Sequence, residues 1–284
     1  MLQSASSYLG QHSGAQDHIV VFPYQTKFGI ASRHDVAGGL MQAYTASGPY
    51  LSQLENAGLD SAPAPAGLYL PDADMRDLSD ADLVRWRNLD LSLPVDGIYN
   101  FTRTPETWFW MLQHYRAEQQ LSPGVFGLQR DDSRASRISM QPQTLGLAAQ
   151  TYTIRERISV VDLGVPDWPP GADFLRVRLT VRYGFWWKLR KPERMQLEIT
   201  RADGRSELRW FIAQPNVATD VWFYPWSPPE LAHYLDADES HWRTTPRPSI
   251  IRLLIHATPL DWVSVTPDAI VVEAADAVRL AMNQ

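Results

Sequence analysis

The stretch Phe174–Tyr183 decides the fold class, because its sequence FLRVRLTVRY alternates strictly between apolar and polar side chains. Successive side chains of a β-strand point to opposite faces, so this period of two predicts a half-buried strand. The polar positions include Arg176, Arg178 and Arg182. We interpret these arginines as one solvated face of a sheet, and binding of an anionic glycan is the alternative use of the same face.

The pattern continues toward the C-terminus. Met195, Leu197 and Ile199 repeat the alternation, and the turn at Ala202-Asp203-Gly204 predicts a hairpin with the apolar run at 208–212. Further apolar runs lie at 221–224, 250–255, 263–265 and 270–272. Many short strands separated by proline and glycine turns indicate an antiparallel β-sandwich of the jelly-roll type. We place this domain at residues 150–278.

The N-terminal half has a different character. Residues 1–17 are rich in serine, glutamine and glycine, and we expect a flexible lead-in there. Residues 18–140 are expected to form a mixed α/β domain. Thr104-Pro105-Glu106 predicts a helix start with a capping side chain and proline in the first turn, and an apolar stripe runs from Trp108 to Tyr115. The expected fold class is therefore α+β, a mixed N-terminal part followed by the sandwich.

The composition excludes several functional classes. The net charge of −6 argues against nucleic acid as a partner, because neutralising phosphates requires a surplus of basic residues. The absence of cysteine excludes disulfides, thiolate zinc sites and cysteine catalysis. Neither glycine-rich nucleotide motif occurs, so no cofactor is predicted. No apolar run is long enough to span a bilayer, and the first residues do not resemble a signal peptide.

The residue patterns of common catalytic centres are also missing. Neither HExxH nor GxSxG occurs, and Ser32-Arg33-His34-Asp35 is interpreted as a charged turn. The acidic loop 236–240 lies between two histidines but lacks the spacing of a calcium loop, so we interpret it as solvated. Four carboxylates remain eligible for glycoside cleavage, with no feature that singles them out, namely Asp72, Asp74, Asp96 and Glu106. No catalytic residue and no metal ligand are predicted.

The aromatic clusters give the more specific hypothesis. The chain holds 11 tryptophans, several of them at expected strand ends. An indole presents a flat apolar face on which the C–H face of a sugar ring can stack, while charged neighbours bind its hydroxyls. The stacking candidates are Trp186, Trp187, Trp226 and Trp242, and the hydroxyl-binding candidates are Arg190, Asp238 and Arg243. The alternative is that rings such as Trp186, Trp222 and Trp262 fill the core.

Several strings resemble a known group of proteins. They are VVFPYQTKFGI (20–30), AGGLMQAYTASGPYL (37–51), VDGIYNFTRTPETWFWMLQHYR (95–116), WWKLRKP (186–192), VWFYPW (221–226) and TPLDWVSVTPDAIVVE (258–273). Together they resemble the soluble extracytoplasmic region that follows the membrane helices in bacterial proteins similar to polytopic lipid-sugar-dependent glycosyltransferases. The catalytic acid of such enzymes lies near the membrane helices, so the resemblance transfers no catalytic residue. At the level of fold, the second half is similar to jelly-roll carbohydrate-binding modules.

These observations favour a non-catalytic module that binds a glycan or polysaccharide as part of a bacterial cell-surface or membrane glycan-processing protein. The resemblance implies a periplasmic or extracytoplasmic location and a membrane-embedded partner or parent chain. The sequence leaves two alternatives open. One is a structural domain that packs on a membrane partner, and the other is a polysaccharide-active enzyme that uses two carboxylates.

Overall fold

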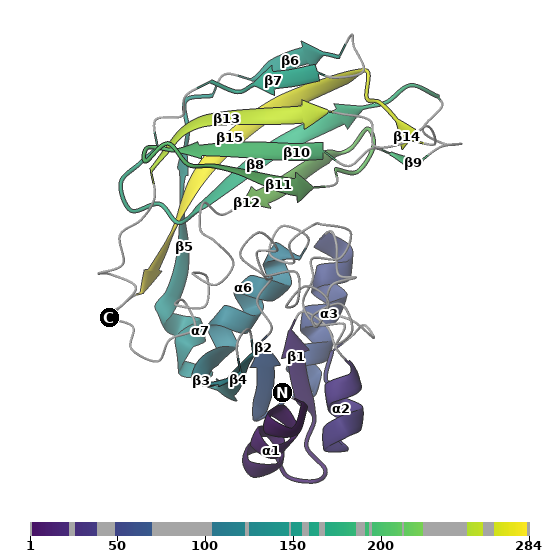
Figure 1. Ribbon diagram of the computed structural model, residues 1–284, viewed down its shortest axis with the longest axis vertical. Coiled ribbons are helices and arrows are strands. Elements are labelled where there is room, and N and C mark those ends of the chain that lie inside the picture. The colour runs from purple at the N-terminus through teal and green to yellow at the C-terminus, as the bar shows by residue number, and fades with distance from the viewer. Residues whose placement is uncertain are drawn as a thin grey trace. The chain divides into compact units, whose positions relative to one another are not determined.

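The structure is a computed structural model, and Figure 1 gives its elements. It describes residues 2–22, 26–38, 49–69, 104–122, 125–147, 149–154, 159–164, 168–185, 191–192, 195–211, 213–223, 249–257 and 264–282. Of these residues, 50% lie in strands and 24% in helices, so the fold is mostly β. Within the same ranges, no helix is long and apolar enough to cross a bilayer. The chain divides into two compact units, with a division between Ser139 and Met140.

The N-terminal unit is built on a four-stranded sheet of order β1-β2-β4-β3. Strands β1 and β2 are parallel, and the other pairs are antiparallel. The strands are β1 (Ile19–Phe22), β2 (Ala66–Tyr69), β3 (Tyr115–Ser122) and β4 (Val125–Arg130). The helices are α1 (Leu2–His12), α2 (Thr26–Ser32), α3 (Pro49–Ser61), α6 (Pro105–His114) and α7 (Ser133–Arg137).

Helix α1 corrects the expectation of a flexible lead-in. Ala5, Tyr8 and Leu9 are fully buried and pack on the face of the sheet that carries Ile19 and Val21. Their spacing of i, i+3 and i+4 places them on one side of a helix, and this apolar stripe stabilises the first residues against the sheet. Serine and glutamine occupy the exposed side, which is why composition alone suggested disorder.

Helix α6 begins at Pro105 as predicted, but two details differ. Thr104 precedes the helix without forming a side-chain capping hydrogen bond. Tyr115, expected on the helical stripe, instead begins β3 and is fully buried. Its ring lies 6.2 Å from that of Phe22, and its hydroxyl donates to the carbonyl of Ala64 at 2.8 Å. The polar end of the ring is therefore satisfied inside the core.

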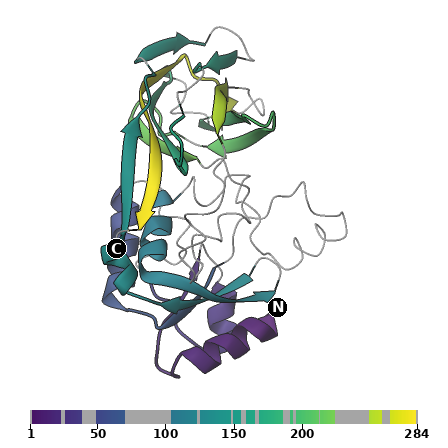
Figure 2. The same cartoon turned by 90° about the vertical axis from the view of Figure 1, so that its left-hand side faces the viewer.

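The C-terminal unit consists mainly of two sheets. One has the order β11-β10-β13-β7, and the other has the order β12-β8-β15-β5, with β6 also paired to β15. Figure 2 shows β5 in teal beside β15 in yellow. The strands are β5 (Ile138–Thr144), β6 (Gln150–Thr153), β7 (Ser159–Asp162), β8 (Phe174–Arg182), β9 (Lys191–Pro192), β10 (Met195–Arg201), β11 (Ser206–Phe211), β12 (Ala218–Phe223), β13 (Ile250–Ala257), β14 (Ser264–Val265) and β15 (Ala269–Met282).

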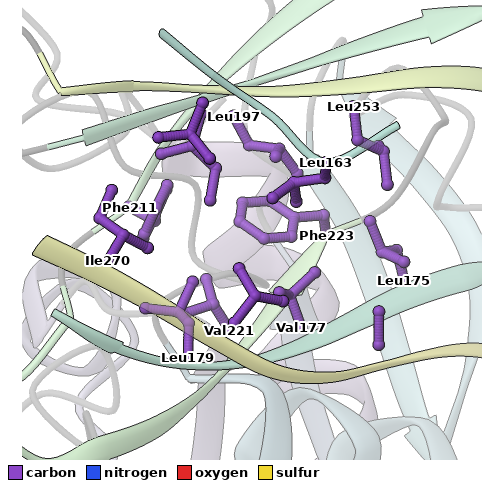
Figure 3. Close-up of a cluster of buried hydrophobic side chains, with 14 of the residues drawn as sticks. Leu163, Leu175, Val177, Leu179, Leu197, Phe211, Val221, Phe223, Leu253 and Ile270 are labelled. Atoms are coloured by element: carbon purple, nitrogen blue, oxygen red, sulfur yellow. The ribbon is translucent and has the colours of Figure 1, made fainter. Parts of the chain in front are cut away.

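One hydrophobic core lies between these two sheets (Figure 3). Strand β8 contributes Leu175, Val177, Leu179 and Val181, all fully buried, which confirms the alternation in the sequence. Strands β10, β11 and β13 contribute from the facing sheet. Burial of each such side chain stabilises the fold by about 1.5–3 kcal/mol before the entropy cost is counted. The hairpin β10–β11 also forms as predicted, with Gly204 at a φ of 83° in its turn.

Candidate functional site

The seven predicted glycan-binding residues all lie outside the described residues. They are Trp186, Trp187, Arg190, Trp226, Asp238, Trp242 and Arg243. The acidic loop 236–240, Asp72, Asp74, Asp96 and Trp262 lie outside as well. Their roles stay predictions. The described part of the chain contains no group of three or more His, Asp or Glu side chains placed to hold a metal ion.

Most of the described tryptophans are buried rather than displayed. Trp108, Trp110, Trp168 and Trp222 are between 5% and 8% exposed, too little for an indole face to receive a sugar ring. Trp222 alternates with Phe223, whose ring enters the core between the sheets. For these rings, packing is the better explanation, and Trp222 is buried as the alternative interpretation expected.

Trp210 differs from these rings because it is only half-buried. It lies on β11, and the neighbouring Phe211 fills the core, so alternation directs Trp210 to the outer face of the sheet. The register then aligns Trp210 with Gln196 on β10 and Gln196 with His256 on β13. His256 pairs in turn with the exposed Val160 on β7. These four residues form a row that crosses the four strands, about 14 Å long at the usual strand spacing.

The next row on the same face supplies carboxylates and more apolar surface. It runs Leu208, Glu198, Leu254 and Asp162 across the same strands. Leu208 is 44% exposed, whereas the side chains of Glu198 and His256 are 25% and 23% exposed. We call these two rows, together with Arg252 of the adjacent row, the outer face of the β10 sheet. A half-buried indole, a carboxamide, an imidazole and a carboxylate thus lie beside one another on a regular sheet.

A hydrogen bond and an ion pair hold the polar side chains of this face in place. The Nε2 atom of His256 lies 2.8 Å from an oxygen of Glu198. Arg252 donates through Nη2 and Nε to Asp162 at 2.8 and 3.2 Å. These hydrogen bonds lower the pKa of Asp162 below its ordinary value, so the carboxylate stays ionised at neutral pH. The face is therefore preorganised, with acceptor oxygens at defined positions.

The arginine ladder on β8 belongs to the other sheet, and carboxylates neutralise two of its members. Arg176 forms an ion pair with Asp276, and its guanidinium also lies 5.6 Å from the centre of the Trp222 ring. Arg178 donates to Glu273 at 3.3 Å, and its Nη1 lies 3.9 Å from Asp220. The solvated-face interpretation thus fits Arg178, whereas Arg176 is only partly exposed.

The catalytic alternatives find no assembled site among the described residues. The Ser32 hydroxyl donates to the carbonyl of Gly29, and His34 Nε2 lies 3.2 Å from the carbonyl of Gly14. Neither bond joins the serine to the histidine, as a nucleophile and its base require. Glu106 accepts a hydrogen bond from Ser52 at 3.2 Å, and no second carboxylate is paired with it in the interactions that the structure records.

Sequence reasoning missed Gln196, Glu198, Trp210 and His256 as a group. Their strands were predicted, and alternation about Leu197 and Phe211 was sufficient to place three of them on outward positions. The pairing register, however, brings them together across 60 residues of sequence, and no short motif encodes that register.

Comparisons with known proteins identify no family. No protein-family model matches the chain, and no curated protein matches it. Among solved structures, the chain is similar to the VP2 subviral particle of infectious bursal disease virus, with 13% identity over 68% of this chain and 42% of the viral chain and a TM-score of 0.31. The T13 particle of the same virus gives 15% identity, coverages of 76% and 49%, and a TM-score of 0.28. The chain spans less than half of these viral chains, and TM-scores of this size carry no argument about fold or function.

Proposed function

We propose that this chain is a non-catalytic, glycan-binding module and that the outer face of the β10 sheet is its binding surface. The observation that carries the proposal is the row Trp210, Gln196 and His256, set beside Glu198. An indole packs against the apolar C–H face of a sugar ring, and the amide, imidazole and carboxylate bind its hydroxyls. A rigid sheet holds these groups in place, which lowers the entropy cost of binding.

The architecture of the proposed module follows from the same sheets. We assign the two-sheet unit to the jelly-roll type of β-sandwich and the N-terminal unit to a mixed α/β domain. The sheet orders and the shared core between the sheets support the first assignment, and the parallel pair β1–β2 with its covering helices supports the second.

The biological setting rests on the resemblance described from the sequence. We propose that the module belongs to a bacterial cell-surface or membrane glycan-processing protein and works in the periplasm or another extracytoplasmic space. A membrane-embedded partner or the membrane part of the same protein then carries out the chemistry. The hydrogen bond between His256 and Glu198 and the ion pair of Arg252 with Asp162 hold these side chains in defined positions, which suits a recognition surface.

A glycan microarray with the full chain tests the proposal, followed by affinity measurements on the saccharide that binds. Replacing Trp210 by alanine is expected to weaken binding about tenfold, equivalent to about 1.4 kcal/mol, because the stacking surface is lost. Tyr50→Ala is the matched control, since Tyr50 is an aromatic residue, 75% exposed, in the N-terminal unit. Equal affinity of Trp210→Ala and Tyr50→Ala, or no binding by the folded chain, contradicts the proposal.

A further inference from the structure

The outer face of the β10 sheet has an unbalanced set of charges. Its described charged side chains are Glu198, Asp162 and Arg252, with His256 adding a positive charge only when protonated. Two carboxylates thus face one permanent cation. Arg252 is the group that an anionic ligand would need, and both its Nε and Nη2 already donate to Asp162.

From this arrangement we infer that the site selects uncharged saccharides and rejects acidic ones, an inference that rests on the proposed function. A sugar hydroxyl both donates and accepts, so it can donate to Glu198 and exchange both kinds of bond with the Gln196 carboxamide. A uronate, sulfate or phosphate group offers only acceptors when ionised. It meets like charge at Glu198 and Asp162, and the charge of Arg252 is already offset by its ion pair with Asp162.

Two of the three arginines on the polar face of β8 are already paired with carboxylates. Arg176 and Arg178 lie on the other sheet, and each has a carboxylate partner, Asp276 for the first and Glu273 for the second. An acidic chain would therefore have to compete with these carboxylates as well. The cationic stripe seen in the sequence is thus compensated at Arg176 and Arg178, whereas Arg182 on the same strand is exposed.

The test uses the full chain and two sets of oligosaccharides of equal length. One set contains neutral gluco-, manno- and galacto-oligosaccharides, and the other contains oligogalacturonates and oligomannuronates. We expect the tightest neutral ligand to bind at least about tenfold more tightly than any uronate, with an affinity that changes little with salt. Glu198→Gln removes one negative charge at nearly constant shape. It is therefore expected to improve uronate binding and so reduce the difference in affinity between neutral and acidic oligosaccharides.

The outcomes separate this inference from the proposed function. If a uronate binds more tightly than the neutral sugars, and Trp210→Ala abolishes that binding, the glycan site stands and the inferred selectivity is wrong. If neither set binds to the folded chain, both are wrong. Preference for neutral ligands that is lost in Trp210→Ala and kept in Tyr50→Ala supports both.

Discussion

Replacing Phe223 by alanine tests the core that joins the two sheets of the C-terminal unit. Phe223 lies on β12 and is 1% exposed, and its ring meets that of Phe211 on β11 edge to face, with centres 5.4 Å apart and planes at 87°. Because β12 and β11 belong to different sheets, this contact links them directly. Phe→Ala at a buried site costs about 3–5 kcal/mol, and the edge-to-face pair accounts for about 0.5–1.5 kcal/mol of it.

The cost is measured by urea unfolding of the full chain, with hydrogen exchange resolved to peptides of β8, β10 and β15. With an m-value of about 2 kcal/mol per molar, the midpoint of the C-terminal unit is expected to fall by about 2 M. Val217→Ala, at a position 49% exposed, is the control and is expected to change stability by less than about 0.5 kcal/mol. If Phe223→Ala lowers the free energy of unfolding by less than about 1 kcal/mol, and all three strands keep their protection from hydrogen exchange, the shared core is refuted.

Three further predictions concern titration and close packing. Burial raises the pKa of Tyr115 to about 12, so the folded state keeps a proton that the unfolded chain loses near pH 10. The free energy of unfolding is therefore expected to fall between pH 10 and pH 12, and Tyr115→Phe should flatten the urea midpoint over this pH range. Gly127→Ala would place a Cβ atom 2.6 Å from the Tyr8 ring, so exchange in residues 2–12 should accelerate, and normal protection there would contradict the packing of α1. The pKa of Asp162 is lowered mainly by its hydrogen bond from Arg252, so this carboxylate stabilises the folded state at neutral pH and loses that effect on acidification. An acid-unfolding profile that is unchanged in Asp162→Asn would argue against this hydrogen bond.

The sequence predicted the C-terminal strands well where one face is buried and the other is solvated. Strand β8 and the β10–β11 hairpin follow from alternation and from the turn at Gly204. Strand β15 was predicted only at 270–272, whereas it runs from Ala269 to Met282. Residues 275–278 of this strand are buried on both faces, with Ala275, Ala277 and Val278 at most 1% exposed, so no alternation marks them.

The N-terminal unit shows two different limits of sequence reasoning. Ala5, Tyr8 and Leu9 have the spacing of an apolar helix face, but the polar composition of residues 1–17 led to the prediction of a flexible segment. Pro105 correctly predicted where α6 begins. The end of the helix was predicted wrongly, because Tyr115 leaves it to form a buried hydrogen bond with the carbonyl of Ala64, 51 residues away in the sequence. For the candidate site, strand positions could be predicted and neighbours across strands could not, because pairing register is a tertiary property.

The most direct measurement is oxidative footprinting of the tryptophans, with and without a saturating saccharide found on the array. A bound sugar shields the indole that it stacks on, and peptide mass spectrometry resolves the positions separately. We expect protection of Trp210, which is half-buried on the outer face of the β10 sheet, and no change at the buried Trp108. Protection confined to Trp186, Trp187, Trp226 or Trp242, with Trp210 unchanged, would contradict the assignment of this face and return the site to the tryptophans predicted from the sequence.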